Sequence, residues 1–227
     1  MKRVLDYIEQ KKMEFAQVPF FGYMQDESID PKRKLGFAEA LAPWVMAFAD
    51  INKYVLRVEG SSDPIQRIIN THTEEDDHHF VMFIEDLKTL GFDSSSTFAE
   101  SLEKLWGPQN IRARKLTYGL TCLIASVDPV LRLAVIEVIE ATGNVAFSEW
   151  RKIAQEFQAQ TGQVLHYFGD VHLGLESGHA MGTEDIEESL SSIELTADQV
   201  EQAYVLVDES FRLFTDMIDE LLAAVKA

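Results

Sequence analysis

Cysteine is almost absent from this 227-residue chain, which contains only one, so no disulfide can form within it. Basic residues are also scarce: 20 lysines and arginines stand against 38 aspartates and glutamates, a formal net charge of -18. That charge repels nucleic acid phosphates and anionic lipid surfaces, so neither nucleic acid nor membrane is expected as a partner. The longest apolar run, GLTCLIASV, is too short to span a bilayer. The N-terminal sequence is a charged amphipathic pattern rather than a secretion signal, so a cytoplasmic location is expected.

Proline is scarce as well, and three of the six prolines follow an aspartate. Asp30, Asp63 and Asp128 therefore predict helix starts, because aspartate caps free backbone amides and proline fits the first helical position. Two capping boxes, which begin at Thr97 and Thr196, predict two further starts.

Apolar residues recur every three or four positions along nearly the whole chain, and no alternating strand pattern is visible. The sequence therefore predicts an all-α fold, arranged as a single helical domain over residues 1–227. Helices are expected at 2–17, 34–57, 64–90, 97–106, 110–126, 129–160, 162–181 and 197–225.

All six histidines fall within two windows, 72–79 and 166–179. The two windows share a spacing in which an acid follows a histidine by four residues and a second histidine follows it by seven. Those positions are His72, Asp76 and His79 in the first window, and His172, Glu176 and His179 in the second. At about 100° per residue, each set falls on one face of its helix, together with apolar residues that should be buried.

Other polar residues are placed by the same construction. Glu140 lies in the apolar stripe of a third helix. Glu75 lies at the edge of the first stripe, whereas His78 points well away from it. An unpaired buried carboxylate costs several kcal/mol, and a domain has only about 5 to 15 kcal/mol of net stability. The acids and histidines must therefore pair with one another, take up protons or surround a cation.

Imidazole and carboxylate ligands together suit iron or manganese better than zinc. A polar network without metal is the alternative, in which the buried groups only fix the register of the helices. A ferritin-like bundle ranks second among metal proteins, since Glu75 with His78 and Glu176 with His179 fit its spacing. Its fourth-helix acid would be Glu39.

The run HLGLESGHAMG, with Glu140 upstream in VIEVIEATGN, resembles the heme-oxygenase-like di-iron oxidases and oxygenases, which are relatives of the TenA and PqqC proteins. The resemblance implies a heme-oxygenase-like (TenA-like) bundle of seven to eight helices, with metal-site helices at about 64–90, 129–160 and 162–181. It implies metal ligands at His79, Glu140, His172, Glu176 and His179. His72 stands where the family has glutamate, so either His72 binds metal or Glu75 or Asp76 supplies the oxygen ligand.

The implied activity is that of a non-heme iron oxidoreductase, which uses O2 on a small organic acid or amine. Its cofactor would be one or two Fe(II) ions, with manganese as an option and without heme, since no histidine precedes residue 72. The oligomeric state is open, with a homodimer as one option. Two other readings remain: a non-enzymatic binding or regulatory module with a polar core, and a metal-free enzyme of PqqC or TenA type. Cys122, the one candidate thiol nucleophile, is expected to be an inert core residue.

Side chains for a substrate cavity are also suggested by the pattern. Aromatic candidates for its wall are Trp44, Phe48, Tyr118, Phe147, Trp150, Tyr167 and Phe168. Basic candidates for holding a substrate carboxylate are Lys53, Arg57, Arg67, Arg112 and Arg132.

Overall fold

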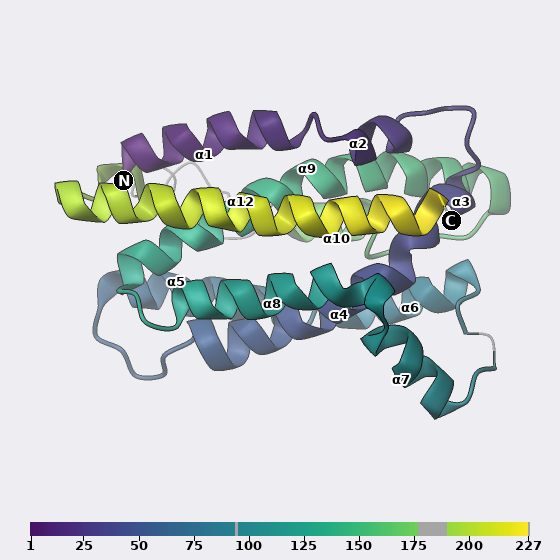
Figure 1. Cartoon of the computed structure of the whole chain (residues 1–227), viewed down its shortest axis with the longest axis horizontal. Coiled ribbons are helices and arrows are strands. Elements are labelled where there is room, and N and C mark those ends of the chain that lie inside the picture. Colours follow the sequence, from purple (N-terminus) through teal and green to yellow (C-terminus); the bar gives the residue numbers. More distant parts are fainter. Residues whose placement is uncertain (94, 177–189, 227) are drawn as a thin grey trace.

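The computed structural model describes residues 1–93, 95–176 and 190–226, and within these ranges all regular elements are helices (Figure 1). The α-helices are α1 (Lys2–Phe15), α2 (Pro19–Met24), α3 (Pro31–Lys34), α4 (Ala38–Ile51), α5 (Pro64–Asp76), α6 (Phe80–Leu90), α7 (Phe98–Trp106), α8 (Ile111–Ile124), α9 (Pro129–Thr161), α10 (Asp170–Glu176) and α12 (Ala197–Lys226). Short 3-10 turns at Leu35–Phe37 and Pro108–Asn110 and a π-helical segment at Asn52–Leu56 complete the described elements. The all-α prediction is confirmed for these ranges.

The predicted caps are in place. The side chains of Asp30, Asp63 and Asp128 each accept hydrogen bonds from backbone N–H groups in the first turn of α3, α5 and α9. The capping box at Thr97 opens α7, and Thr196 exchanges the equivalent hydrogen bonds with Gln199 before α12. These local signals define where the helices begin.

α9 is the centre of the bundle. Six of its seven residues from 133 to 139 are buried, so this stretch contacts neighbours on all sides rather than along one stripe. α1, α12 and α5 pack against it, and α12 also packs against α8, which in turn packs against α4 (Figure 1). None of the described helices combines the length and hydropathy of a bilayer-spanning segment.

The prediction of one helix over 64–90 is wrong, because the chain turns at residues 77–79 and divides it into α5 and α6. The run TEEDD places four acids at the carbonyl end of α5, where negative charge is unfavourable. Arg57 supports the break: its guanidinium donates to the carbonyl of Thr73 at 2.7 Å and to the carboxylate of Asp77 at 2.8 Å.

The prediction of a helix over 162–181 is also wrong at its start, since α10 begins only at Asp170. Gly162 ends α9 in the left-handed conformation, at a φ of 73°, and the chain then runs without helix to Gly169. A Cβ at Gly169 would collide with the carbonyl oxygen of Leu165. Leu165 and Phe168 are buried, but through this loop rather than through a helical stripe. These interruptions and the short α2 and α3 give more helices than the seven to eight that were expected.

Asp86 on α6 holds this loop. Its carboxylate accepts hydrogen bonds from the backbone N–H groups of His166, Tyr167 and Phe168, at 2.7, 2.9 and 3.0 Å. Burial raises the pKa of the Asp86 carboxyl, and the three N–H donors oppose that rise. One buried side chain thus satisfies three backbone groups that have no helical partner.

Replacing Asp86 with alanine is expected to destabilise the protein by about 3 kcal/mol or more, because each buried N–H left without an acceptor costs about 1 to 3 kcal/mol. Urea unfolding measures the change. The neighbouring exposed Glu85 is the matched control, and Glu85→Ala should change stability by no more than about 0.5 kcal/mol. Equal effects of the two substitutions would contradict the role given to Asp86.

Candidate metal centre

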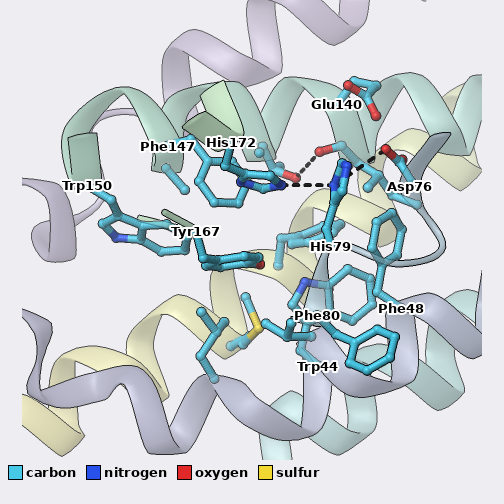
Figure 2. Close-up of a pocket in the computed structure, with 18 of the residues that line it drawn as sticks. Trp44, Phe48, Asp76, His79, Phe80, Glu140, Phe147, Trp150, Tyr167 and His172 are labelled. Carbon is cyan, nitrogen blue, oxygen red and sulfur yellow. Dashed lines mark hydrogen bonds and ion pairs between the residues drawn. The ribbon is translucent and has the colours of Figure 1, made fainter. Parts of the chain in front are cut away.

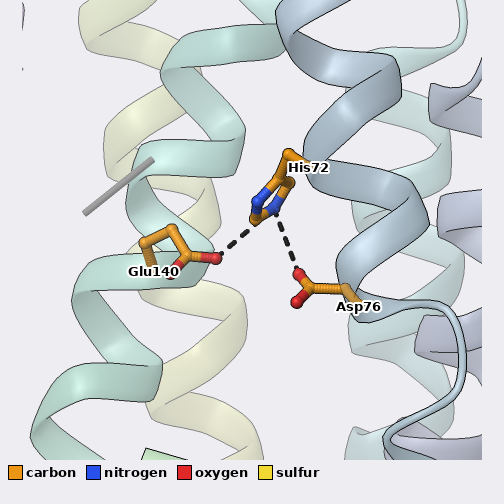
Figure 3. A group of neighbouring side chains, drawn as sticks. All are labelled: His72, Asp76 and Glu140. Atoms are coloured by element: carbon orange, nitrogen blue, oxygen red, sulfur yellow. Dashed lines mark ion pairs between the residues drawn. The ribbon is translucent and has the colours of Figure 1, made fainter. Parts of the chain in front are cut away.

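Two helices bring three ligand-type side chains together inside the bundle (Figure 3). His72 and Asp76 lie one turn apart on α5, and Glu140 faces them from α9. The Nε2 atom of His72 lies 3.2 Å from Oδ2 of Asp76 and 3.4 Å from Oε1 of Glu140. One ligand atom from each residue lies within 4.8 Å of the others.

These spacings fit a shared cation. Ligand atoms at about 2.1 Å from one ion, separated by angles between octahedral and tetrahedral values, stand about 3.0 to 3.4 Å apart. Both measured distances from His72 fall within or at the edge of that interval. The three residues could therefore provide part of the coordination shell of one cation, and the same distances also suit a polar network without metal.

Two further histidines extend the cluster (Figure 2). Nδ1 of His79, which lies in the turn after α5, is 3.8 Å from Oδ1 of Asp76 and 3.0 Å from Nε2 of His172 on α10. Asp76 thus directs one carboxylate oxygen to His72 and the other toward His79. The carboxylate of Asp76 therefore faces nitrogen atoms on both of its sides.

Burial makes the charge of this cluster costly. His72, Asp76, His79 and His172 are all nearly inaccessible to solvent, and only the side chain of Glu140 is partly exposed, at 26%. The facing oxygens of the two carboxylates lie within 4.8 Å of one another, and two such charges repel by at least about 3.5 kcal/mol at an effective dielectric constant of 20. One protonated imidazole offsets part of this repulsion, whereas a divalent cation offsets all of it.

The ring of His172 is held by its neighbours. Tyr167 stacks on it with a centroid separation of 4.6 Å and an interplanar angle of 20°. Phe147 meets it edge to face at 4.2 Å. Because Asp86 fixes the backbone of Tyr167, the loop clamp on α6 also sets the position of this imidazole.

A cavity of about 70 Å³ adjoins the cluster (Figure 2). Its polar wall is formed by Asp76, His79, Glu140 and His172. Most of the remaining wall is apolar, and its lining is Phe15, Leu41, Trp44, Val45, Phe48, Ala49, Phe80, Ile139, Thr142, Gly143, Ala146, Phe147, Trp150, Tyr167, Phe214, Met217 and Ile218. The cavity is thus a small apolar chamber with the candidate ligands at one end.

Five of the seven aromatic residues expected to line a cavity do so: Trp44, Phe48, Phe147, Trp150 and Tyr167. Phe168 is buried elsewhere, and Tyr118 is exposed. Among the described residues the lining contains no lysine or arginine, so the five basic residues considered as carboxylate anchors do not contribute to this wall. Phe80, from the start of α6, is a lining residue that the sequence pattern did not suggest.

The remaining predicted residues divide into three groups. His78 is 65% exposed and approaches Asp77, so the prediction that it points away from the site is confirmed. Glu75 is half-buried and does not belong to the cluster of His72, Asp76 and Glu140. Glu176 is the last residue of α10, and the structure does not describe its side chain. His179 lies outside the described residues.

Two residues that supported other readings lie away from the centre. Glu39 forms an ion pair with Lys104 at 2.5 Å rather than joining the cluster, which removes the fourth acid of the ferritin-like arrangement. Cys122 is exposed on α8 and does not line the cavity, so the expectation of a core thiol is wrong. The helical spacing placed it among apolar residues, but α8 turns that side to solvent.

No family model and no curated protein matches the chain. The chemical interpretation of the centre therefore rests on its own geometry.

Removing a cluster residue should weaken metal binding. His72→Ala and Glu140→Gln are each expected to lower the affinity for Mn(II) by at least about 100-fold, because each removes a direct ligand and its charge or lone pair. Equilibrium dialysis with Mn(II) measures the affinity. His78→Ala is the matched control on the same stretch of chain and should stay within about twofold of the native protein. The assignment of faces fails if all three substitutions have the same effect.

Proposed function

We propose that the protein is a non-heme iron oxidase or oxygenase with a heme-oxygenase-like bundle, which uses O2 on a small amine or uncharged apolar molecule. The observation that carries the proposal is a set of two carboxylates and three imidazoles from α5, the following turn, α9 and α10, all buried except the partly exposed Glu140, which adjoins an apolar cavity. Ferrous iron, when bound, supplies coordination positions and electrons for the activation of O2.

The donor set fits iron or manganese. Neutral imidazole nitrogens and carboxylate oxygens hold these ions, and no thiolate that would favour a softer metal lies in the cavity wall. His72, Asp76 and Glu140 would hold one ion, with spacings that match shared coordination. His79 and His172 would hold a second ion, and Glu176 and His179 are further candidate ligands for it.

The residues around the centre have three roles in this proposal. Tyr167 and Phe147 orient the imidazole of His172. The aromatic walls exclude bulk water from the site, which limits side reactions with solvent. No lysine or arginine is among the described residues of the lining. The carboxylate of an organic acid would therefore find no such side chain to pair with, which favours an amine or an uncharged apolar molecule as the substrate.

A second reading is supported by two of the same distances. The separations of 3.2 Å between His72 and Asp76 and of 3.0 Å between His79 and His172 also suit hydrogen bonds. A non-enzymatic module with a polar core would have such a network, and so would a metal-free enzyme. Metal binding separates these readings from the proposal.

Anaerobic titration with Fe(II) is the decisive measurement. The native protein is expected to bind one or two ferrous ions per chain, counted by Mössbauer spectroscopy, and to gain about 2.7 kcal/mol of stability at free iron 100-fold above its dissociation constant. Exposure to O2 should then oxidise the bound iron. A protein that binds no iron and keeps its melting temperature unchanged in Fe(II) would overturn the proposal.

Filling the cavity should separate substrate binding from metal binding. Ala146 is buried in the wall on α9, and Ala146→Phe is expected to reduce substrate-dependent O2 consumption at least tenfold while the iron content stays the same. Ala125→Phe, at an exposed position after α8, is the control for the added ring. Unchanged turnover in Ala146→Phe would place the substrate elsewhere.

A further inference from the structure

Asn52 is a buried amide without a partner. Its residue is 0% exposed, and neither Oδ1 nor Nδ2 forms a hydrogen bond. A buried polar group left unsatisfied costs about 1 to 3 kcal/mol, so a side chain with two such groups is an expensive choice for a core position. The cost is unexplained by packing alone, because leucine has nearly the same size and no polar atoms.

The helical register places Asn52 at the level of Asp76. Phe48 and Ala49 on one side and His79 and Phe80 on the other line the same cavity. The two segments run antiparallel, since Val58 pairs with Asn70 whereas the earlier Lys53 pairs with the later Asp77, at 3.9 Å.

Asn52 lies one turn after Phe48, and Asp76 lies about one turn before His79. Because the segments are antiparallel, both steps lead in the same direction. Both residues are buried, whereas the next residue in each segment, Lys53 and Asp77, reaches the outer side. Asn52 and Asp76 therefore occupy the inner side of the same helix pair, and the π-helical segment packs against α5.

The backbone at Asn52 is also unusual. It begins the π-helical segment Asn52–Leu56, in which the carbonyl of Asn52 accepts a hydrogen bond from the N–H of Arg57 at 3.2 Å. π-helical turns are rare in proteins and occur frequently at functional sites, because the extra residue rotates the side chains that precede and follow it. Here the turn coincides with the level of the candidate ligands.

We propose that the amide of Asn52 belongs to the metal centre, with its Oδ1 bound to the cation beside Asp76, directly or through one water molecule. An amide oxygen is a suitable neutral ligand for Fe(II) or Mn(II) in a set that already carries two carboxylates. It adds an oxygen donor without adding a third negative charge to a buried site. This inference rests on the metal centre of the proposed function and adds a ligand to it.

Asn52→Leu tests the inference by separating stability from metal binding. Without metal, the variant should be as stable as the native protein or more stable, because an apolar side chain replaces an unsatisfied amide. Its affinity for Mn(II), followed by the electron paramagnetic resonance signal of the free ion, should fall about 10- to 100-fold. A residue with a purely structural role would leave the affinity unchanged.

Two further variants sharpen the result. Asn52→Asp keeps the oxygen and adds a charge, so its metal-free form should melt below the native protein and Mn(II) should raise its melting temperature more than that of the native protein. Ser210→Ala removes another buried polar group without a partner, from α12 and outside the cavity wall, and should leave Mn(II) affinity within about twofold.

The outcomes distinguish this inference from the proposed function. If the native protein binds Mn(II) and Asn52→Leu binds it equally well, the role of Asn52 is wrong and the metal centre stands. If the native protein binds neither Mn(II) nor Fe(II), both fail together. Weaker binding in Asn52→Leu with retained or increased metal-free stability supports both.

Discussion

The burial of two carboxylates among three imidazoles is the constraint on which the interior of this bundle depends. Asp76 is buried and Glu140 is only partly exposed, so their mutual repulsion is weakly screened and has to be offset inside the protein. Imidazoles at hydrogen-bonding distance reduce the cost, and a divalent cation converts it into binding free energy. The same balance explains why the other groups assigned to the centre, the histidines and the amide of Asn52, add no further negative charge to it.

The rigid elements of the fold bring these groups to one place. α9 is buried over several turns, so Glu140 is fixed relative to the core, and α5 lies against it with His72 and Asp76 on the facing side. The chain then turns after Asp76, which allows His79 to approach His172 as well as Asp76. Asp86 completes the arrangement, since it holds the loop whose Tyr167 stacks on His172. Polar contacts outside the centre thus determine the geometry inside it.

The apolar cavity gives the centre its chemical context. A metal site in open water would exchange ligands with solvent, whereas the proposed site adjoins a chamber walled largely by aromatic and aliphatic side chains. Such a wall admits O2 and small apolar molecules more readily than ions. Among the described residues this wall contains no lysine or arginine that could pair with an anionic substrate.

The sequence by itself determined the all-α class, the helix starts at Asp63 and Asp128, and the outward direction of His78, because capping and the 3.6-residue period act over a few residues. It also indicated His72, Asp76 and Glu140 as candidate metal ligands, because they lie on apolar helix stripes. Only the tertiary structure decided that the chain breaks after Asp76, that residues 162–169 form a loop, and that Asn52 is buried. These features depend on Arg57, Asp86 and the neighbouring helices, which are distant in sequence, and no local periodicity encodes such contacts.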